Sequence, residues 1–148
     1  NQLKKFRNEC KKRSIKFYIA NDLNTAVNCK ADGLYLSSYN RKHYNIRFIK
    51  NSLKIIGSAH NIKEIYEKRK QNCKNIVLSR LFKTDYKNKK GHLGIIKFNF
   101  MAINSKEKLI PLGGIRQKNL NSLKIAKSNS LAILSEVKKK PAIIRRLF

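Results

Sequence analysis

Short apolar segments recur along the chain, typically about twenty residues apart, with stretches of helical spacing between them. Each segment ends in polar residues or glycines and predicts a strand. The expected strands are residues 15–20, 34–37, 53–57, 75–78, 109–112 and 131–135. Regular alternation of strands with helices implies a parallel sheet. A doubly wound sheet and a (β/α) barrel both fit, but no Gly-x-Gly-x-x-Gly or P-loop motif is present, which counts against the common nucleotide-binding folds.

Apolar residues at helical spacing predict the helices. A basic helix is expected over residues 2–13, and another over residues 24–30 with Asn24 as its N-cap. Asn61 followed by Glu64 is similar to a capping box and predicts a helix start at residue 62. Three further helices are expected, over residues 93–103, over residues 120–127 and after Pro141. The first of these should be well buried, although its residues 95–100 also fit a strand.

The charge of the chain is strongly positive. Its 148 residues, enough for one domain, include 35 Lys and Arg against 8 Asp and Glu, a net charge of +27. Such an excess is typical of proteins that bind nucleic acid or anionic membranes. The basic residues are spread through every segment, however, beside many Asn and Ile, and codon bias from an AT-rich genome gives the same mixture. The charge therefore indicates nucleic acid only weakly, and it suits phosphorylated substrates equally well.

The three cysteines, Cys10, Cys29 and Cys73, are isolated from one another. No Cys-x-x-Cys pair or even framework is present, so neither zinc nor disulfides are implied. Buried, reduced cysteines are typical of a cytoplasmic protein. The sequence shows no signal peptide and no apolar run of the length of a membrane span, so we expect no membrane association.

The segment Leu-Ile-Pro-Leu-Gly-Gly-Ile at residues 109–115 predicts a strand, a tight glycine loop and a helix start. Adjacent glycines at the end of a strand let backbone N–H groups approach a ligand, and a helix N-terminus adds partial positive charge. With Ser135 after the next strand, Gly113 and Gly114 would form a phosphate site. The alternative is a plain turn. If the segment is a phosphate site, we expect Gly114→Val to abolish phosphate binding and to leave the fold intact.

The carboxyl ends of the other expected strands also carry polar groups, and ligands of parallel sheets bind at these ends. Asp22 could hold Mg²⁺, or could instead cap a helix or pair with a lysine. His60, after a Gly-Ser-Ala loop, could act as a general acid or base, or be an ordinary surface or capping residue. Thr84 and Lys87 lie in a loop rich in lysines, for which solvation is the simpler interpretation.

Taken in order, these strand ends resemble the family of thiamine phosphate synthases and TenI-like thiazole tautomerases, which are TIM barrels. The family motifs are Ile-Asn-Asp, Gly-Ala-Asp-Gly-Val-His-Leu-Gly-Gln, Gly-x-Ser-x-His, Pro-Thr-x-Thr-Lys, Gly-Gly-Ile and Val-Ile-Ser. The matching segments are residues 20–22, 30–38, 56–60, 83–87, 113–115 and 133–135, and order and spacing hold over residues 15–137. The resemblance implies a single domain over residues 1–148, a partial barrel of about six βα units that lacks the family's first two.

The resemblance also implies a reaction. The synthase joins hydroxymethylpyrimidine diphosphate to thiazole phosphate, giving thiamine phosphate and pyrophosphate. By residue-for-residue transfer, Asp22 would bind Mg²⁺, and two sets of residues would bind the substrates. The pyrimidine diphosphate would be held by Asn21, Ser58 and Lys87, and the thiazole phosphate by Thr84, Gly113, Gly114, Leu134 and Ser135.

The chain departs from the family pattern at several positions. The second metal-binding Asp corresponds to Asn40, the Gly-Pro after the sixth strand to Ser79-Arg80, and one loop Thr to Tyr86. The Gln-x-Arg-x-Lys motif, which contacts the pyrimidine diphosphate, is absent from residues 1–148. A thiazole tautomerase, in which His60 would be the key residue, and an inactive homologue are therefore alternatives. A basic RNA-binding or ribosomal protein is the alternative outside the family, and the oligomeric state stays open.

Overall fold

Five parallel strands form the sheet of the computed structural model, which describes residues 2–44, 53–85 and 91–134. They follow one another in sequence order, each hydrogen-bonded to the next. Within the described residues no neighbouring pair is antiparallel, as the alternation of strands and helices predicted. The strands are β1 (Tyr18–Ala20), β2 (Gly33–Leu36), β3 (Lys54–Ala59), β4 (Asn75–Ser79) and β5 (Lys108–Leu112).

The sixth expected strand begins beside β5. Leu112 and Ala132 form a parallel bridge, and the Ala132 N–H donates to the carbonyl of Pro111 at 3.0 Å. Residues 131–134 therefore continue the row of strands, whereas Ser135 lies outside the described residues.

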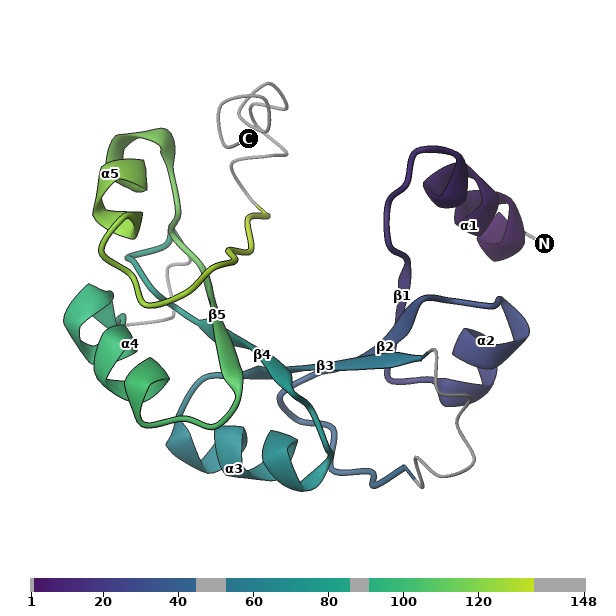
Figure 1. Cartoon of the computed structure of the whole chain (residues 1–148), viewed down its shortest axis with the longest axis horizontal. Coiled ribbons are helices and arrows are strands. Elements are labelled where there is room, and N and C mark those ends of the chain that lie inside the picture. The colour runs from purple at the N-terminus through teal and green to yellow at the C-terminus, as the bar shows by residue number, and fades with distance from the viewer. Residues whose placement is uncertain (1, 45–52, 86–90, 135–148) are drawn as a thin grey trace.

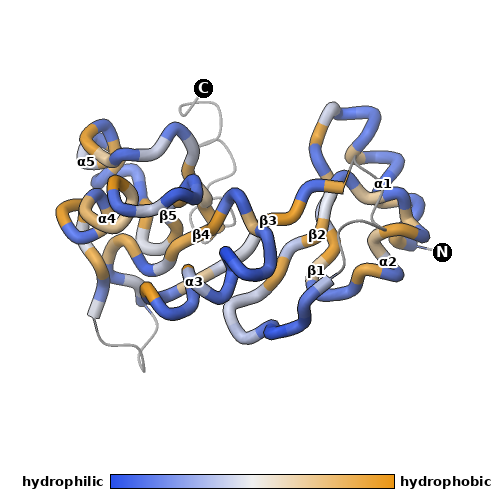
Figure 2. Tube along the Cα trace, turned by 60° about the horizontal axis from the view of Figure 1, so that its bottom comes forward, coloured by the Kyte–Doolittle hydropathy of each residue, from blue (hydrophilic) through white to orange (hydrophobic). Residues whose placement is uncertain are grey.

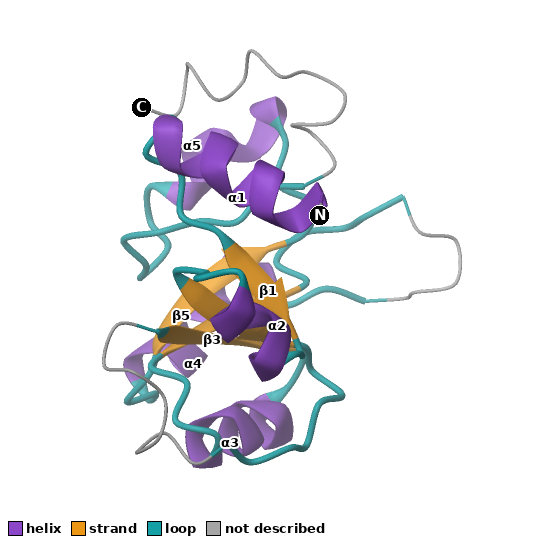
Figure 3. Cartoon of the chain, turned by 90° about the vertical axis from the view of Figure 1, so that its right-hand side faces the viewer, coloured by secondary structure: helices purple, strands orange, loops and turns teal. Residues whose placement is uncertain are grey.

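The sheet curves into an open arc, and α2 (Leu23–Asn28), α3 (Ile62–Lys70) and α4 (Gly94–Ile103) lie along its outer side (Figure 1). The side view in Figure 3 likewise places α2 and α3 on the outer side of the arc. The helices are α1 (Gln2–Lys12), α2 (Leu23–Asn28), α3 (Ile62–Lys70), α4 (Gly94–Ile103) and α5 (Leu120–Leu123), with the 3-10 turn η2 (Gln117–Asn119) leading into α5.

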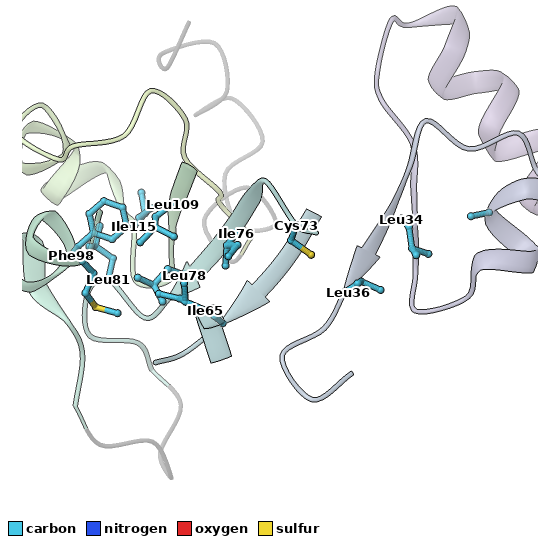
Figure 4. Close-up of a cluster of buried hydrophobic side chains, with 13 residues drawn as sticks. Leu34, Leu36, Ile65, Cys73, Ile76, Leu78, Leu81, Phe98, Leu109 and Ile115 are labelled. Carbon is cyan, nitrogen blue, oxygen red and sulfur yellow. The ribbon is translucent and has the colours of Figure 1, made fainter. Parts of the chain in front are cut away.

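The hydrophobic core lies between the sheet and these outer helices. Alternate residues of a strand face one side, so Leu34 and Leu36 of β2 are both fully buried, as are Ile76 and Leu78 of β4. Phe98 of α4 packs into the same core (Figure 4). Figure 2 shows the corresponding hydrophobic colour along parts of β2, β3 and β4.

Three helix expectations are wrong in detail. The N-cap of α2 is Asp22 and not Asn24, because the helix begins at Leu23. The helix at residue 94 exists, but it is not well buried: Ile96 is 88% exposed and Phe100 66%, since only one face of α4 meets the sheet. The helix predicted over residues 120–127 ends at Leu123, and the segment after Pro141 lies outside the described residues.

Within the described residues, none of the helices combines the length and apolar character needed to cross a lipid bilayer.

Candidate functional site

The parallel order brings the carboxyl ends of all five strands to one edge of the arc. Asn21 follows β1, Ser37 follows β2, His60 follows β3, Ser79 ends β4 and Gly113 follows β5. Most of the residues predicted from the sequence therefore lie along one rim. Lys87 and Ser135 fall outside the described residues, while Leu134 lies at the end of the row and is 56% exposed.

At the β1 end, the side chain of Asn21 organises the neighbouring loop. Its Oδ1 accepts hydrogen bonds from the N–H and Oγ of Ser37 and from Nδ2 of Asn40, each at 3.0 Å. Its backbone carbonyl accepts from the Tyr44 hydroxyl at 3.0 Å. Asn21 adopts a left-handed φ of 60°, a conformation that Asn tolerates better than most residues. Its side-chain oxygen is thus committed to the loop after β2.

A buried lysine supports this loop from the helix side. Lys68 of α3 is fully buried, and its Nζ donates to the carbonyl of Asn40 and to Oε1 of Gln71, both at 2.8 Å. Gln71 in turn donates to the carbonyls of Asn40 and Lys42. Burial lowers the pKa of the Lys68 ammonium, because the charged form loses its hydration.

The burial of Lys68 was not predictable from the sequence pattern. Lys68 stands in a helix whose last turn is Lys68, Arg69 and Lys70, which is typical of a solvated face. Its stem passes over Gly57 of β3, where a Cβ would lie 2.9 Å from Lys68 Cγ and Cδ. The glycine of the Gly-Ser-Ala-His segment therefore makes room for the lysine.

Asp22 is occupied by its capping role. Its carboxylate accepts from the Thr25 N–H at 3.0 Å and from Thr25 Oγ1 at 2.6 Å. These hydrogen bonds lower the pKa of Asp22, the bond from the Thr25 side chain contributing most.

The described residues do not fit a dedicated Mg²⁺ site. At the position of the family's second carboxylate ligand, the Asn40 Oδ1 already accepts from the Lys42 N–H at 2.8 Å. Among the residues that the structure describes, no group of three His, Cys, Asp or Glu side chains could hold a metal ion. Because Mg²⁺ prefers carboxylate oxygens and water, a single capping carboxylate beside a neutral amide offers it little.

His60 and Ser79 meet across the ends of β3 and β4. The Ser79 Oγ lies 2.7 Å from Nδ1 of His60, and the Ser79 carbonyl oxygen lies 3.3 Å from the same nitrogen. The N–H of His60 donates to Oε2 of Glu64 at 2.8 Å, and Asn61 caps α3 by accepting from the Glu64 N–H at 2.9 Å. The expected capping signal is confirmed, and it fixes the backbone that carries the imidazole ring.

Ser58 lies on the concave side of β3. Gly57, its neighbour, faces Lys68 and Cys73 on the helix side, so Ser58 faces the interior of the arc, where it is half-buried. Its register partner on β4 is Val77. The structure thus places Ser58 inside the arc, one strand position before the rim.

The β5 end forms a tight corner with the loop after β4. The Leu81 N–H donates to the carbonyl of Leu112 at 2.9 Å, and the Phe82 N–H donates to the carbonyl of Gly113 at 3.0 Å. Arg116 pairs with Asp85 across the same corner. These contacts bring the loop that carries Thr84 against Gly113 and Gly114.

Both glycines are needed for the shape of this corner. Gly113 has a φ of 99° and Gly114 of 67°, which glycine adopts without strain. A Cβ on Gly114 would lie 2.5 Å from the carbonyl oxygen of Lys83. The expectation that Gly114→Val leaves the fold intact is therefore wrong, because the added side chain meets backbone.

Two arginines lie close to this corner. A Cβ on Gly113 would lie 3.2 Å from Cβ and Cγ of Arg80, so the Arg80 stem packs on the glycine. Its guanidinium lies 3.5 Å from the Thr84 hydroxyl. Sequence reasoning overlooked Arg80 and Arg116, since the chain has 35 Lys and Arg and their positions depend on loop contacts.

The chain is similar in sequence to known proteins. A sequence model of the family described as thiamine monophosphate synthase matches residues 1–137. The thiamine-phosphate synthase of Prochlorococcus marinus subsp. pastoris is 35% identical over 130 residues, covering 85% of this chain and 36% of the relative. The thiamine biosynthesis bifunctional protein ThiED of Geobacter sulfurreducens is 29% identical over 133 residues, covering 89% of this chain and 27% of the relative. The chain thus spans about a third of the curated relatives that it matches.

A solved structure has the same fold. The thiamine phosphate pyrophosphorylase from Pyrococcus furiosus superimposes with a TM-score of 0.75 and 18% identity, over 98% of this chain and 73% of that chain. The fold is thus a partial (β/α) barrel of the TIM type, as the strand-end pattern suggested. With the family match over residues 1–137, this confirms the resemblance: the chain belongs to the thiamine monophosphate synthase family.

Proposed function

We propose that this chain serves in thiamine biosynthesis as a thiamine phosphate synthase, a transferase that couples hydroxymethylpyrimidine diphosphate to thiazole phosphate and releases pyrophosphate. The observation that carries this proposal is the corner where Gly113 and Gly114 meet the loop of Thr84, with two guanidinium groups beside it. Arginine is well suited to phosphate, because its planar donors match two oxygens at once. The curated relatives that carry the synthase name support the reaction.

In this proposal the thiazole phosphate binds at the β4–β5 corner, with Leu134 and Ser135 completing its site. Asn21, Ser58 and Lys87 contact the pyrimidine diphosphate. Pyrophosphate leaves as the thiazole nitrogen attacks, and hydrogen-bond donors already in place stabilise the departing charge. No step is assigned to Mg²⁺, because Asp22 and Asn40 are committed to local hydrogen bonds. A cytoplasmic location and a single-domain partial barrel remain part of the proposal.

A thiazole tautomerase is the second candidate. It is favoured by the accessible imidazole of His60 and by the poor fit of the metal site, since proton movement on a thiazole carboxylate phosphate needs no pyrophosphate site. An inactive homologue would bind ligand without turnover. RNA binding would account for the net charge of +27 but not for the ordered strand ends.

The direct test supplies the chain with both substrates and detects thiamine phosphate by mass spectrometry. Calorimetry with thiazole phosphate, and with the unphosphorylated thiazole alcohol as control, measures binding separately. We expect the phosphate form to bind, and Thr84→Val to weaken binding about tenfold, the effect of losing one hydrogen bond to a charged group. Binding without product favours the tautomerase or an inactive homologue. No binding, together with sequence-selective RNA affinity at physiological salt, would overturn the proposal.

A further inference from the structure

The contact between His60 and Ser79 carries an inference beyond the assignment of either residue to a substrate. Two oxygens of one residue, the Oγ at 2.7 Å and the carbonyl at 3.3 Å, lie near the same ring nitrogen, Nδ1. A neutral imidazole carries one proton, on Nδ1 or on Nε2, and the neighbours of the ring decide which.

A carbonyl oxygen can only accept a hydrogen bond. If Nδ1 were unprotonated, its lone pair would face the lone pairs of the Ser79 carbonyl. If Nδ1 carries the proton, both Ser79 oxygens accept from it. We propose that Ser79 is a positioning residue that holds His60 in the tautomer protonated at Nδ1, so that Nε2 presents its lone pair to the ligand site.

The surroundings keep this geometry in place. His60 follows the fully buried Ala59, and its N–H is bound to Glu64, so the ring starts from a fixed backbone. Ser79 is the last residue of β4 and pairs in register with Leu112 of β5. Glu64 faces the backbone of His60, and its two carboxylate oxygens accept from the His60 N–H and from Nδ2 of Asn61, so it does not compete for Nδ1.

Two chemical consequences follow, and they rest on the proposed function. Nε2 of His60 can accept a hydrogen bond or a proton from the bound substrate. On accepting a proton at Nε2, the ring keeps its Nδ1–H bond to Ser79. The hydroxyl proton of Ser79 is also free to be donated to a ligand oxygen, since the Oγ acts as an acceptor towards His60.

The tautomer can be measured without substrate. The chain has three histidines, all of them exposed, so ¹⁵N-histidine labelling gives few signals, and His60→Gln identifies those of His60. At a pH where titration shows the ring to be neutral, the ¹⁵N shifts of His60 should identify Nδ1–H as the main form. In Ser79→Ala, the ratio of the tautomers should move towards Nε2–H by about fivefold, equivalent to about 1 kcal/mol.

Two controls accompany this measurement. Ser122→Ala, at an exposed position of α5, should leave the His60 spectrum unchanged, and circular dichroism reports whether each variant is folded. Ser79→Thr keeps the hydroxyl and should restore the Nδ1–H form. A dominant Nε2–H tautomer in the parent, or a Ser79→Ala spectrum identical to the parent, would overturn the proposal.

Kinetic measurements with substrate separate this inference from the proposed function. If the chain turns over substrate, Ser79→Ala should lower kcat with little change in KM, because Nε2 of His60 no longer presents its lone pair to the substrate while the phosphate corner is intact. If the chain does not convert the substrates, the proposed function fails, whereas the ¹⁵N spectra still decide whether the proposed tautomer is correct.

Discussion

At residue 114, the backbone conformation and the neighbouring backbone leave room only for glycine. Its φ of 67° lies in the left-handed region, and the backbone of residues 82 and 83 leaves no space for a side chain. Gly114→Ala is therefore expected to lower the free energy of unfolding by well over about 1 kcal/mol in urea denaturation.

Gly91 offers a matched control for this prediction. It has a similar φ of 82°, but among the described residues no atom lies within 4 Å of a built Cβ. Gly91→Ala should show only the smaller cost of the backbone conformation. Equal losses in the two variants would mean that the crowding at Gly114 is relieved by movement of the loop.

Glu107 couples stability to acid pH. Arg69 donates to its two carboxylate oxygens at 2.6 and 2.9 Å, and Ser105 Oγ donates at 2.8 Å. The Arg69 contact lowers the pKa of Glu107 below its ordinary 4.5. The unfolded chain then binds more protons at low pH, so this contribution is complete above about pH 4.5 and is lost as the pH falls through the lowered pKa.

Glu107→Gln should therefore flatten the fall in stability as the pH drops below about 4.5, measured by urea denaturation. Glu9→Gln is the control, because the Glu9–Lys12 pair is exposed and such pairs contribute little. The same pH profile in parent and Glu107→Gln would assign the acid sensitivity to other carboxylates, such as Asp32, whose pKa is also lowered.

A substitution at Lys68 tests how much the buried polar contacts under the β2–β3 loop contribute to stability. Lys68→Met fills a similar volume but leaves Oε1 of Gln71 without the donor that it has now. An unsatisfied buried acceptor costs about 1–3 kcal/mol, and we expect a loss of that size in chemical denaturation. A Lys68→Met variant as stable as the parent would show that Gln71 rearranges to bond elsewhere.

Among the elements, α3 has the clearest start signal. Asn61 accepts from the Glu64 N–H at 2.9 Å, so Asn61→Ala should lower stability by about 1 kcal/mol in thermal or urea unfolding. Asn61→Asp keeps an acceptor oxygen and should retain most of that stability. If Ala and Asp variants behaved alike, the cap would be contributing nothing.

The strands were predictable because apolar periodicity and loop length act locally. All five appear within a few residues of their expected places, and the sixth begins at a bridge. The helix boundaries that depend on backbone turns were not predictable. Asn21 has a left-handed φ, and α2 begins at Leu23, so Asp22 and not Asn24 becomes the N-cap. The apolar sequence of α4 predicted burial, but only packing decides which side meets the sheet.

Contacts between distant residues limited the prediction of the site. Sequence order identified His60 and Gly113, but the pairing of His60 with Ser79 depends on the adjacency of β3 and β4. The burial of Lys68 depends on the missing side chain of Gly57 and on the Asn40 carbonyl. No local pattern encodes either relation, so both required the three-dimensional structure.

For the whole molecule, the dominant property is charge. The positively charged side chains, with a net charge of +27 on 148 residues, repel one another in the compact state, and salt screens this repulsion. Raising NaCl from about 0.05 to 0.5 M should raise Tm by about 3–5 °C, roughly what 1 kcal/mol is worth at this size. A variant with Glu at the exposed Lys4, Lys63, Lys97 and Lys118 should respond less. Equal responses would show that salt acts by another route.

The sequential strand order has a consequence for synthesis on the ribosome. Each strand pairs with the one that precedes it in the chain, so every pairing closes only the segment between two consecutive strands. Because chains emerge from the amino end, β2 can join β1 before β3 has been made, and each later strand adds to an existing edge. Folding of this arc can therefore keep pace with translation.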